Sequence, residues 1–209
     1  MDYISPVANV CMVLIWLVYL QIFLFQYKRA NRPLMVIHHA QGSDPDAACM
    51  LVNMSQEPVH VLSVMAKVTT QDKSYVLPVT EYQRLTVDDQ NVQGRLRQGP
   101  LQSGEYLLLG TFEEIILGER SKESGQAGDL RQATRLELRI AAVHGPSRYH
   151  IGARRHFRIE TGNGKPCIIP EGLYTEQLAS RRSRKLVQRW VEEQISPVSA
   201  NQRDPETTG

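Results

Sequence analysis

The stretch of sequence that decides the fold is TRLELRIAAVHGPSRYHIGARRHFRIE, residues 134–160. In its first part apolar residues alternate with charged ones, a period typical of a β-strand that buries one face. The apolar face of this part comprises Leu136, Leu138, Ile140 and Ala142. After the turn signal GPS a second alternating part follows, and its apolar face comprises Ile151, Ala153, Phe157 and Ile159. The stretch therefore predicts an antiparallel β-hairpin.

Arg155 interrupts the alternation of the second part. It falls on the apolar face, between Ala153 and Phe157. Two explanations are open. Either Gly152 forms a bulge that shifts the register of the strand, or Arg155 lies at the end of the sheet.

Segments on the N-terminal side of the hairpin have the same period of two. They comprise residues 34–39, 48–55, 59–70 and 74–79, with turn residues between them. After a loop-like segment at 88–104, residues 105–112 are apolar again. Many short strands separated by turns predict a mainly β domain over residues 34–164, an antiparallel β-sandwich of the immunoglobulin-like type. Thr111 and Glu114 have the spacing of a capping box, so a short helix is expected after the last of these segments.

The N-terminal segment has a different character. VANVCMVLIWLVYLQIFLF, residues 7–25, contains no charged residue. Because a spanning helix needs about 20 apolar residues, we predict a single transmembrane helix over residues 7–27, with a short extracytoplasmic segment at 1–6. A cleaved signal peptide is less favoured, since the segment before the apolar run contains Asp2 and no cation.

The cations beside this segment predict its orientation. Lys28, Arg29 and Arg32 all follow the apolar run, within a linker at residues 28–33. Cations beside a spanning helix stay on the cytoplasmic side. The sequence therefore predicts a single-pass protein of the inner cell membrane, with its N-terminus outside and its C-terminal domain in the cytoplasm.

The C-terminal part is expected to contain a linker and an amphipathic α-helix over residues 165–196, with a disordered polar tail at 197–209. The helical period is expected from Thr175 onward. The apolar stripe comprises Leu186, Val187, Trp190, Val191 and Ile195, extended backwards by Ser183 and Ala179.

This helix is also the first candidate site, because it is strongly basic. The candidate residues are Arg181, Arg182, Arg184, Lys185, Arg189 and Trp190. We favour a helix that docks on the sandwich through its stripe and leaves its cations in solvent. The alternatives are contact with anionic lipid at the membrane surface and binding of a partner. Nucleic acid is not expected as the partner, because no aromatic-rich strand platform accompanies the cations.

The second candidate site lies on the hairpin. By alternation, Arg154, His156 and Arg158 share one face of their strand. Such a row of cations can bind a phosphate or an acidic peptide. We favour, however, a solvent-exposed face on which the cations pair with strand carboxylates such as Glu137.

Composition narrows the classes of function. With a net charge of +2, the chain as a whole is not strongly basic. A basic surface that binds a partner must therefore be confined to one part of the chain. The three cysteines lie far apart, and no Cys/His cluster has the spacing of a zinc site. We therefore expect no metal and no cofactor, and no arrangement of residues predicts a catalytic site.

Together these features predict a non-enzymatic, membrane-anchored protein. Its partners would be the lipid bilayer and a protein in the membrane or the cytoplasm. The cytoplasmic domain would act as an interaction module or as an accessory subunit of a membrane complex. The alternative is a membrane-tethered sensor that binds an anionic small molecule or a lipid headgroup through the basic strand face.

Overall fold

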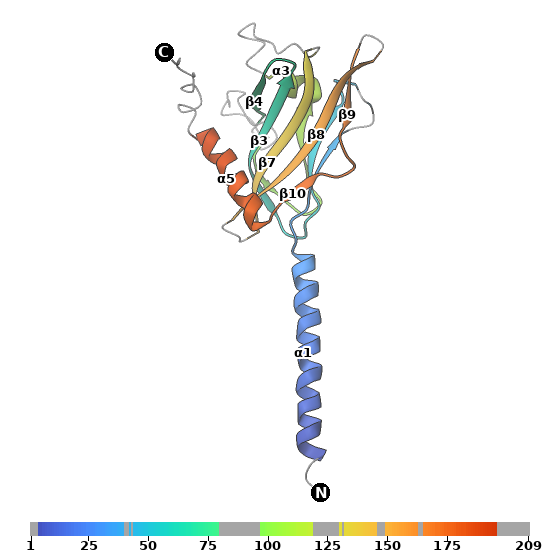
Figure 1. Ribbon diagram of the computed structural model, residues 1–209, viewed down its shortest axis with the longest axis vertical. Coiled ribbons are helices and arrows are strands. Elements are labelled where there is room, and N and C mark those ends of the chain that lie inside the picture. Colours follow the sequence, from blue (N-terminus) through green and yellow to red (C-terminus); the bar gives the residue numbers. More distant parts are fainter. Residues whose placement is uncertain are drawn as a thin grey trace, which may run out of the picture. The chain divides into compact units, whose positions relative to one another are not determined.

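The chain forms two compact units, Met1–Arg32 and Pro33–Gly209 (Figure 1). The computed structural model describes residues 4–39, 42, 44–79, 97–118, 130, 132–145, 149–162 and 165–195. The first unit contains one apolar helix. The second is mainly β, with antiparallel sheets and a C-terminal helix. The predicted tail at 197–209 lies outside the described residues.

The helix of the first unit, α1 (Ile4–Ala30), is longer than predicted. Its 25 residues from Pro6 to Ala30 are long and apolar enough to span a membrane, and none of its most apolar part is buried. Lys28 and Arg29 belong to its last turn, although residues 28–33 were predicted as a linker. Both are good helix formers, and cations are favoured at a helix C-terminus. The helix then ends shortly before Pro33, since a proline disfavours the helical conformation of the residue before it.

The second unit contains a small antiparallel sheet. Its strands are β1 (Met35–His39), β2 (Ala48–Asn53) and β6 (Tyr106–Thr111), in the order β1-β2-β6. β1 and β2 lie in segments that the sequence predicts as strands, and β6 forms in the apolar segment 105–112. Met35, Ile37, Cys49 and Leu51 alternate with less buried neighbours, as expected for a sheet with one buried face.

A larger antiparallel sheet faces the small one. Its main path is β10 (Glu176–Leu178), β8 (His150–Gly162), β7 (Ala133–His144), β3 (Val59–Thr70) and β4 (Ser74–Pro78). Two further strands, β5 (Gly99–Leu101) and β9 (Lys165–Pro170), pair with β3 and β8. The predicted hairpin is confirmed as the pair β7–β8.

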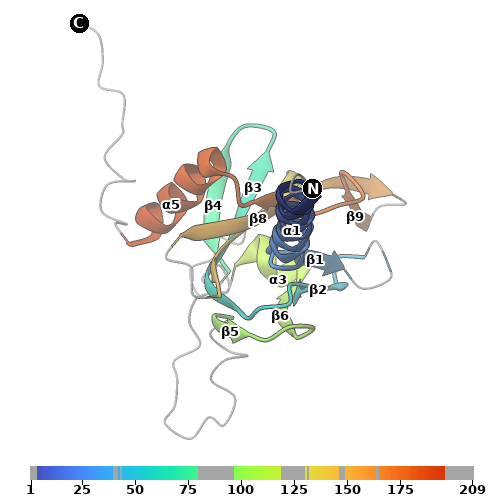
Figure 2. The ribbon, with the colours of Figure 1, turned by 90° about the horizontal axis from the view of Figure 1, so that it is seen from below.

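One hydrophobic core joins the two sheets, which form separate layers in Figure 2. Leu136, Leu138 and Ile140 of β7 face this core, as their alternation predicts. In β3 the core residues change from odd to even positions, because the pairing with β7 shifts between Val61 and Ser63. The antiparallel β domain is therefore as predicted, whereas its immunoglobulin-like type remains a prediction.

The short helix α3 (Phe112–Leu117) adds apolar residues to the same core. The predicted capping box is confirmed, because the Thr111 side chain accepts a hydrogen bond from the Glu114 backbone and the Glu114 side chain accepts one from the Thr111 backbone. The rings of Phe112 and Phe157 meet edge to face, with centroids 4.9 Å apart.

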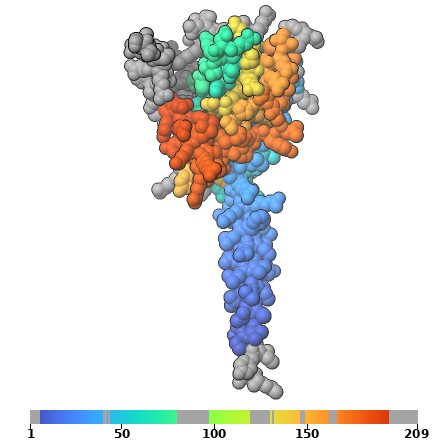
Figure 3. Space-filling model, in the orientation of Figure 1, coloured from blue at the N-terminus to red at the C-terminus, as the bar shows by residue number. Residues whose placement is uncertain are grey.

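The C-terminal helix α5 (Arg181–Ile195) packs on the outer face of the large sheet (Figure 3). Ser63, Ala141 and Gly152 lie opposite one another on β3, β7 and β8, so a row of small residues crosses this face. A Cβ atom at Gly152 would lie 2.6 Å from Cγ2 of Val187 and 2.9 Å from the carbonyl oxygen of Ile140. The row of small residues therefore lets the helix approach the sheet closely.

The sequence prediction for residues 165–180 is wrong. The predicted linker forms β9, and the predicted start of the helix forms β10 before α5 begins at Arg181. Ala179 thus lies outside the helix whose stripe it was expected to extend. Pairing with β8 decides the conformation of these short segments, because tertiary contacts outweigh their weak local propensity. The β domain consequently extends beyond the predicted boundary at residue 164.

Candidate functional site

The outer face of the large sheet brings predicted site residues together in rows. Residues directly opposite each other on neighbouring strands have adjacent side chains. One row comprises Met65, Arg139, Arg154 and Glu176. The next row comprises Lys67, Glu137 and His156. Charged side chains of both signs therefore lie next to the apolar area that α5 covers.

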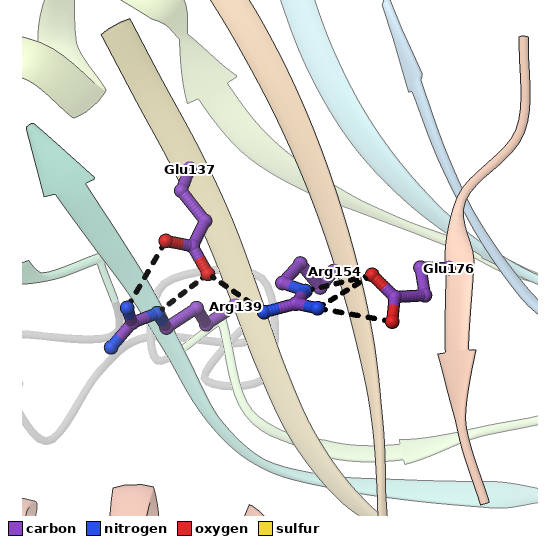
Figure 4. Close-up of polar contacts among 4 residues, drawn as sticks. All are labelled: Glu137, Arg139, Arg154 and Glu176. Carbon is purple, nitrogen blue, oxygen red and sulfur yellow. Dashed lines mark hydrogen bonds and ion pairs between the residues drawn. The ribbon is translucent and has the colours of Figure 1, made fainter. Parts of the chain in front are cut away.

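Four of these side chains form a connected ion network, which Figure 4 shows. Arg139 donates two hydrogen bonds to Glu137, of 3.0 and 3.1 Å. Arg154 donates two hydrogen bonds to Glu176, of 2.9 and 3.0 Å. The Nη1 atom of Arg154 also lies 3.7 Å from Oε1 of Glu137. Each arginine thus uses its planar fork on a carboxylate, the geometry that gives the strongest ionic hydrogen bonds.

The network changes the ionisation of Glu137. Burial alone would raise the pKa of this carboxyl group. The hydrogen bond from Arg139 and the positive charges of Arg139, His156 and Arg154 outweigh the effect of burial, so the pKa lies below its ordinary value. Glu137 is therefore a fixed negative charge of the folded domain.

The predicted basic strand face is present, but its arginines are paired. Arg154, His156 and Arg158 lie on the outer face of β8, while their neighbours along the strand are buried. Arg158 lies 3.3 Å from Glu160 and 3.5 Å from Glu171. With Arg154 bound to Glu176, both arginines of the set are neutralised by carboxylates of the domain itself.

Both sequence explanations of Arg155 are wrong. The pairing of β8 with β7 is continuous through Gly152, so no bulge occurs there, and Arg155 lies within the strand. Arg155 is only 8 % exposed, and its guanidinium donates a hydrogen bond to the carbonyl oxygen of Ile37 on the opposite sheet. The side chain also packs 5.6 Å from the centre of the Phe157 ring. Arg155 therefore connects the two layers from inside the core.

The charge of Arg155 acts on two polar side chains, those of the buried Cys49 and the partly buried His39. Burial raises the pKa of the Cys49 thiol to about 12, although the charge of Arg155 acts in the opposite direction. Burial lowers the pKa of His39, and the charges of Arg155 and His38 lower it further. Cys49 is thus a neutral thiol, which is a poor nucleophile and a poor metal ligand.

The residues of the basic helix divide into buried and exposed members. Trp190 is 3 % exposed and packs with Val187 on the large sheet, so the helix is docked through its stripe. Leu186 and Val191 are partly buried beside them. The exposed cations are Arg181, Arg182, Lys185 and Arg189. Within the described part of the chain, no carboxylate forms an ion pair with these four side chains.

Arg184 differs from its neighbours on the helix. It donates a hydrogen bond of 3.1 Å to the carbonyl oxygen of Ala179, and its guanidinium lies 4.7 Å from the centre of the Tyr149 ring. This contact fixes the start of α5 against the beginning of β8.

Sequence reasoning missed the contact between the ion network and the helix. The guanidinium of Arg139 lies 5.2 Å from the centre of the Trp190 ring, within the range of a cation–π interaction. Arg139 therefore binds Glu137 and Trp190 at the same time. The sequence feature that could have indicated this contact is the single tryptophan in the apolar stripe of the helix. A large buried ring must pack against a side chain of the sheet.

Other predicted sites are less informative. Lys28 and Arg29 lie in the last turn of α1 and Arg32 follows it, but the orientation that they predict is a proposal. Among the described residues, no three side chains of His, Cys, Asp or Glu lie together as a metal site would require.

Comparison with known proteins adds little. No protein-family model matches the chain, and no curated protein is similar to it. The crystal structure of a protein from Bordetella pertussis with the provisional name ApaA aligns with a TM-score of 0.20 and 14 % sequence identity. The alignment covers 72 % of this chain and 94 % of that one. At such a TM-score neither fold nor function is transferred.

Proposed function

We propose that the protein is a non-enzymatic, single-pass membrane protein whose β domain binds a protein partner in the membrane or the cytoplasm. The observation that supports this function most strongly is α1. Its apolar side chains are exposed all round, and none of its most apolar part is covered by the rest of the chain. Such a helix needs a hydrocarbon environment.

The orientation is part of the same proposal. With Lys28, Arg29 and Arg32 after the helix and Asp2 before it, the β domain lies in the cytoplasm and the anchor crosses the inner membrane. The β domain, of immunoglobulin-like type, then acts as an interaction module or as an accessory subunit of a membrane complex.

Crosslinking in intact cells tests the partner. A photoreactive amino acid in place of exposed Arg189 or exposed Leu108 should capture a defined protein, and a detergent extract should retain the complex. The same amino acid at Val18, which faces lipid in this proposal, is a control for neighbours captured by chance. If no position on the β domain captures a defined protein, the interaction function is wrong.

The alternative is a sensor of an anionic small molecule or lipid headgroup that uses Arg154, His156 and Arg158. Their common face supports it, whereas the ion pairs of Arg154 and Arg158 oppose it, because a ligand must compete with Glu176, Glu160 and Glu171. A salt-sensitive loss of ligand binding in Arg154→Ala would favour the sensor. Capture of a partner without any ligand favours the interaction module.

A further inference from the structure

One end of the β domain, where the chain enters it, has a distinctive surface. We call it the tether end. Leu34 donates a hydrogen bond of 2.8 Å to Ser55 Oγ, and its carbonyl oxygen accepts one of 2.8 Å from Met54. Ser103 donates to the carbonyl oxygen of Ser55 at 2.7 Å. The first residues of β1 and the turns that follow β2 and β5 therefore lie together.

The start of α5 belongs to the same end. The Gln177 side chain accepts a hydrogen bond of 3.0 Å from the Met35 backbone N–H and donates one of 2.6 Å to the Met35 carbonyl oxygen. Gln177 precedes Arg181 by only four residues. Tyr149, which Arg184 contacts, directly precedes β8 on the same side. The hydrogen bonds thus bring the first turn of α5 close to the entry of the chain.

The tether end combines apolar and basic side chains in an exposed surface. Leu34, Met54 and Tyr149 are 43 %, 58 % and 62 % exposed. Arg181, Arg182 and Lys185 are exposed beside them. Glu57 and Glu105 also belong to the turns of this end, since both backbones accept hydrogen bonds from Asn53, and the three exposed cations outnumber these two carboxylates. Aromatic and apolar groups next to cations are typical of surfaces that lie at the headgroup level of a bilayer.

The length of the connection keeps this surface close to lipid. Only residues 31–34 separate the end of α1 from β1. Fully extended, they span about 14 Å, at about 3.5 Å per residue. The attraction between cations and an anionic surface extends over about 8 Å at physiological ionic strength. If α1 spans the membrane, the tether end is therefore held within or near the range of this attraction.

We propose that the tether end lies on the anionic surface of the bilayer that α1 spans. Arg181, Arg182 and Lys185 contact lipid phosphates, and Leu34, Met54 and Tyr149 enter the interface. Trp190 has no part in this contact, because it is buried against the sheet. The inference rests on the proposed membrane anchor, and it fixes how the domain is presented to a partner.

A fluorescent label at Met54 tests the contact in the full-length chain. Cys11 and Cys167 are changed to serine, while Cys49 remains, since it is buried and its pKa is raised to about 12. Met54→Cys then receives an environment-sensitive dye, and the protein is reconstituted into vesicles of phosphatidylcholine with or without phosphatidylglycerol. The control label is at Ile169→Cys, an exposed apolar position on β9, away from the tether end.

The expected result is a blue-shifted emission at position 54 in anionic vesicles, with quenching by a lipid-borne quencher and no change at position 169. The triple change Arg181→Glu, Arg182→Glu and Lys185→Glu should lower the contacting fraction at least about tenfold, because each cation near such a surface strengthens the attraction about fivefold. The corresponding glutamine variant should have a smaller effect. Near-UV circular dichroism verifies that the variants remain folded.

Two outcomes would overturn the inference. One is an unchanged emission in both kinds of vesicle. The other is a shift that appears only after a partner protein is added. Extraction by alkaline carbonate separates these results from a failure of the proposed function. A chain that resists extraction but shows no shift refutes only the lipid contact, whereas a chain that is extracted lacks the anchor.

Discussion

The guanidinium group of Arg155 is enclosed between the two sheets. It has no carboxylate partner among the described residues, and its Nε atom has no hydrogen-bond acceptor there. Burial consequently lowers its pKa, and Cys49 offsets this effect in part. Its contact with the Ile37 carbonyl satisfies a backbone group of β1 that no strand reaches. Arg155 therefore stabilises the packing of the two sheets and does not act as a ligand-binding residue.

Arg155→Ala should lower the free energy of unfolding by about 2–4 kcal/mol, because it leaves a buried carbonyl unsatisfied and a cavity beside Phe157. Denaturant unfolding of the full-length chain in detergent, followed by near-UV circular dichroism, measures the change. Arg158→Ala, on the exposed face of the same strand, is the matched control and should cost at most about 1 kcal/mol. Equal losses in both variants would show that Arg155 has no special role.

The lowered pKa of Glu137 predicts a pH dependence. An acid whose pKa is lower in the folded than in the unfolded state stabilises the fold above the ordinary pKa of 4.5. That stability is lost as the pH falls through the lowered pKa of the folded domain. Glu137→Gln should therefore be less stable at neutral pH by about 1–3 kcal/mol, since it loses ionic hydrogen bonds. Its stability should also fall less on acidification.

Unfolding midpoints measured from neutral pH to pH 3 check this prediction. Glu113→Gln, on the exposed side of α3, serves as the control and should follow the wild-type curve. Parallel pH curves for wild type and Glu137→Gln would contradict the role given to the ion network.

At the scale of elements, α5 shows how a helix is fitted to a sheet. Small residues at Ser63, Ala141 and Gly152 leave room, and Val187 and Trp190 fill it. The guanidinium of Arg139, which belongs to the ion network, packs over the ring of Trp190. Docking thus depends on the sheet as much as on the helix.

Trp190→Ala should destabilise the protein by roughly 3 kcal/mol, the cost of a large-to-small change in a core. Thermal or denaturant unfolding of the full-length chain provides the measurement. Gln188→Ala, on the exposed side of the same helix, should stay within about 0.5 kcal/mol of wild type. An unchanged stability in Trp190→Ala would mean that the docked helix contributes nothing to the fold.

The strands illustrate what a single sequence can predict. The sequence pattern located β3 and the hairpin β7–β8 almost to the residue, because these strands are long and alternate over much of their length. Segments such as β10 have three residues, too few for a period to be recognised. For the candidate site, alternation found the shared face of Arg154, His156 and Arg158. It could not find Glu176 as a partner, since that contact depends on a strand pairing between distant segments.

At the scale of the whole molecule, cations determine the proposed orientation. Changing Lys28, Arg29 and Arg32 together to glutamine should give a mixture of orientations, because these residues provide the charge bias beside the helix. A reporter that is active only outside the cytoplasm, fused after Gly209, should gain activity in this variant and be inactive in wild type. The same changes at Arg181, Arg182 and Lys185, farther along the chain, are the control. A wild-type fusion that is already active would reverse the proposed orientation.

The attachment of β1 has a mechanical consequence. β1 pairs with β2 over five residue pairs, and Gln177 and Thr175 hold its other edge through side-chain hydrogen bonds. A pull on residues 31–34 along the strand stretches all these bonds at once, in shear, rather than opening them one by one. In the proposed membrane-anchored protein, tension between the membrane and a partner would thereby be shared across the two sheets. The first strand after the proposed anchor is therefore bonded along both of its edges.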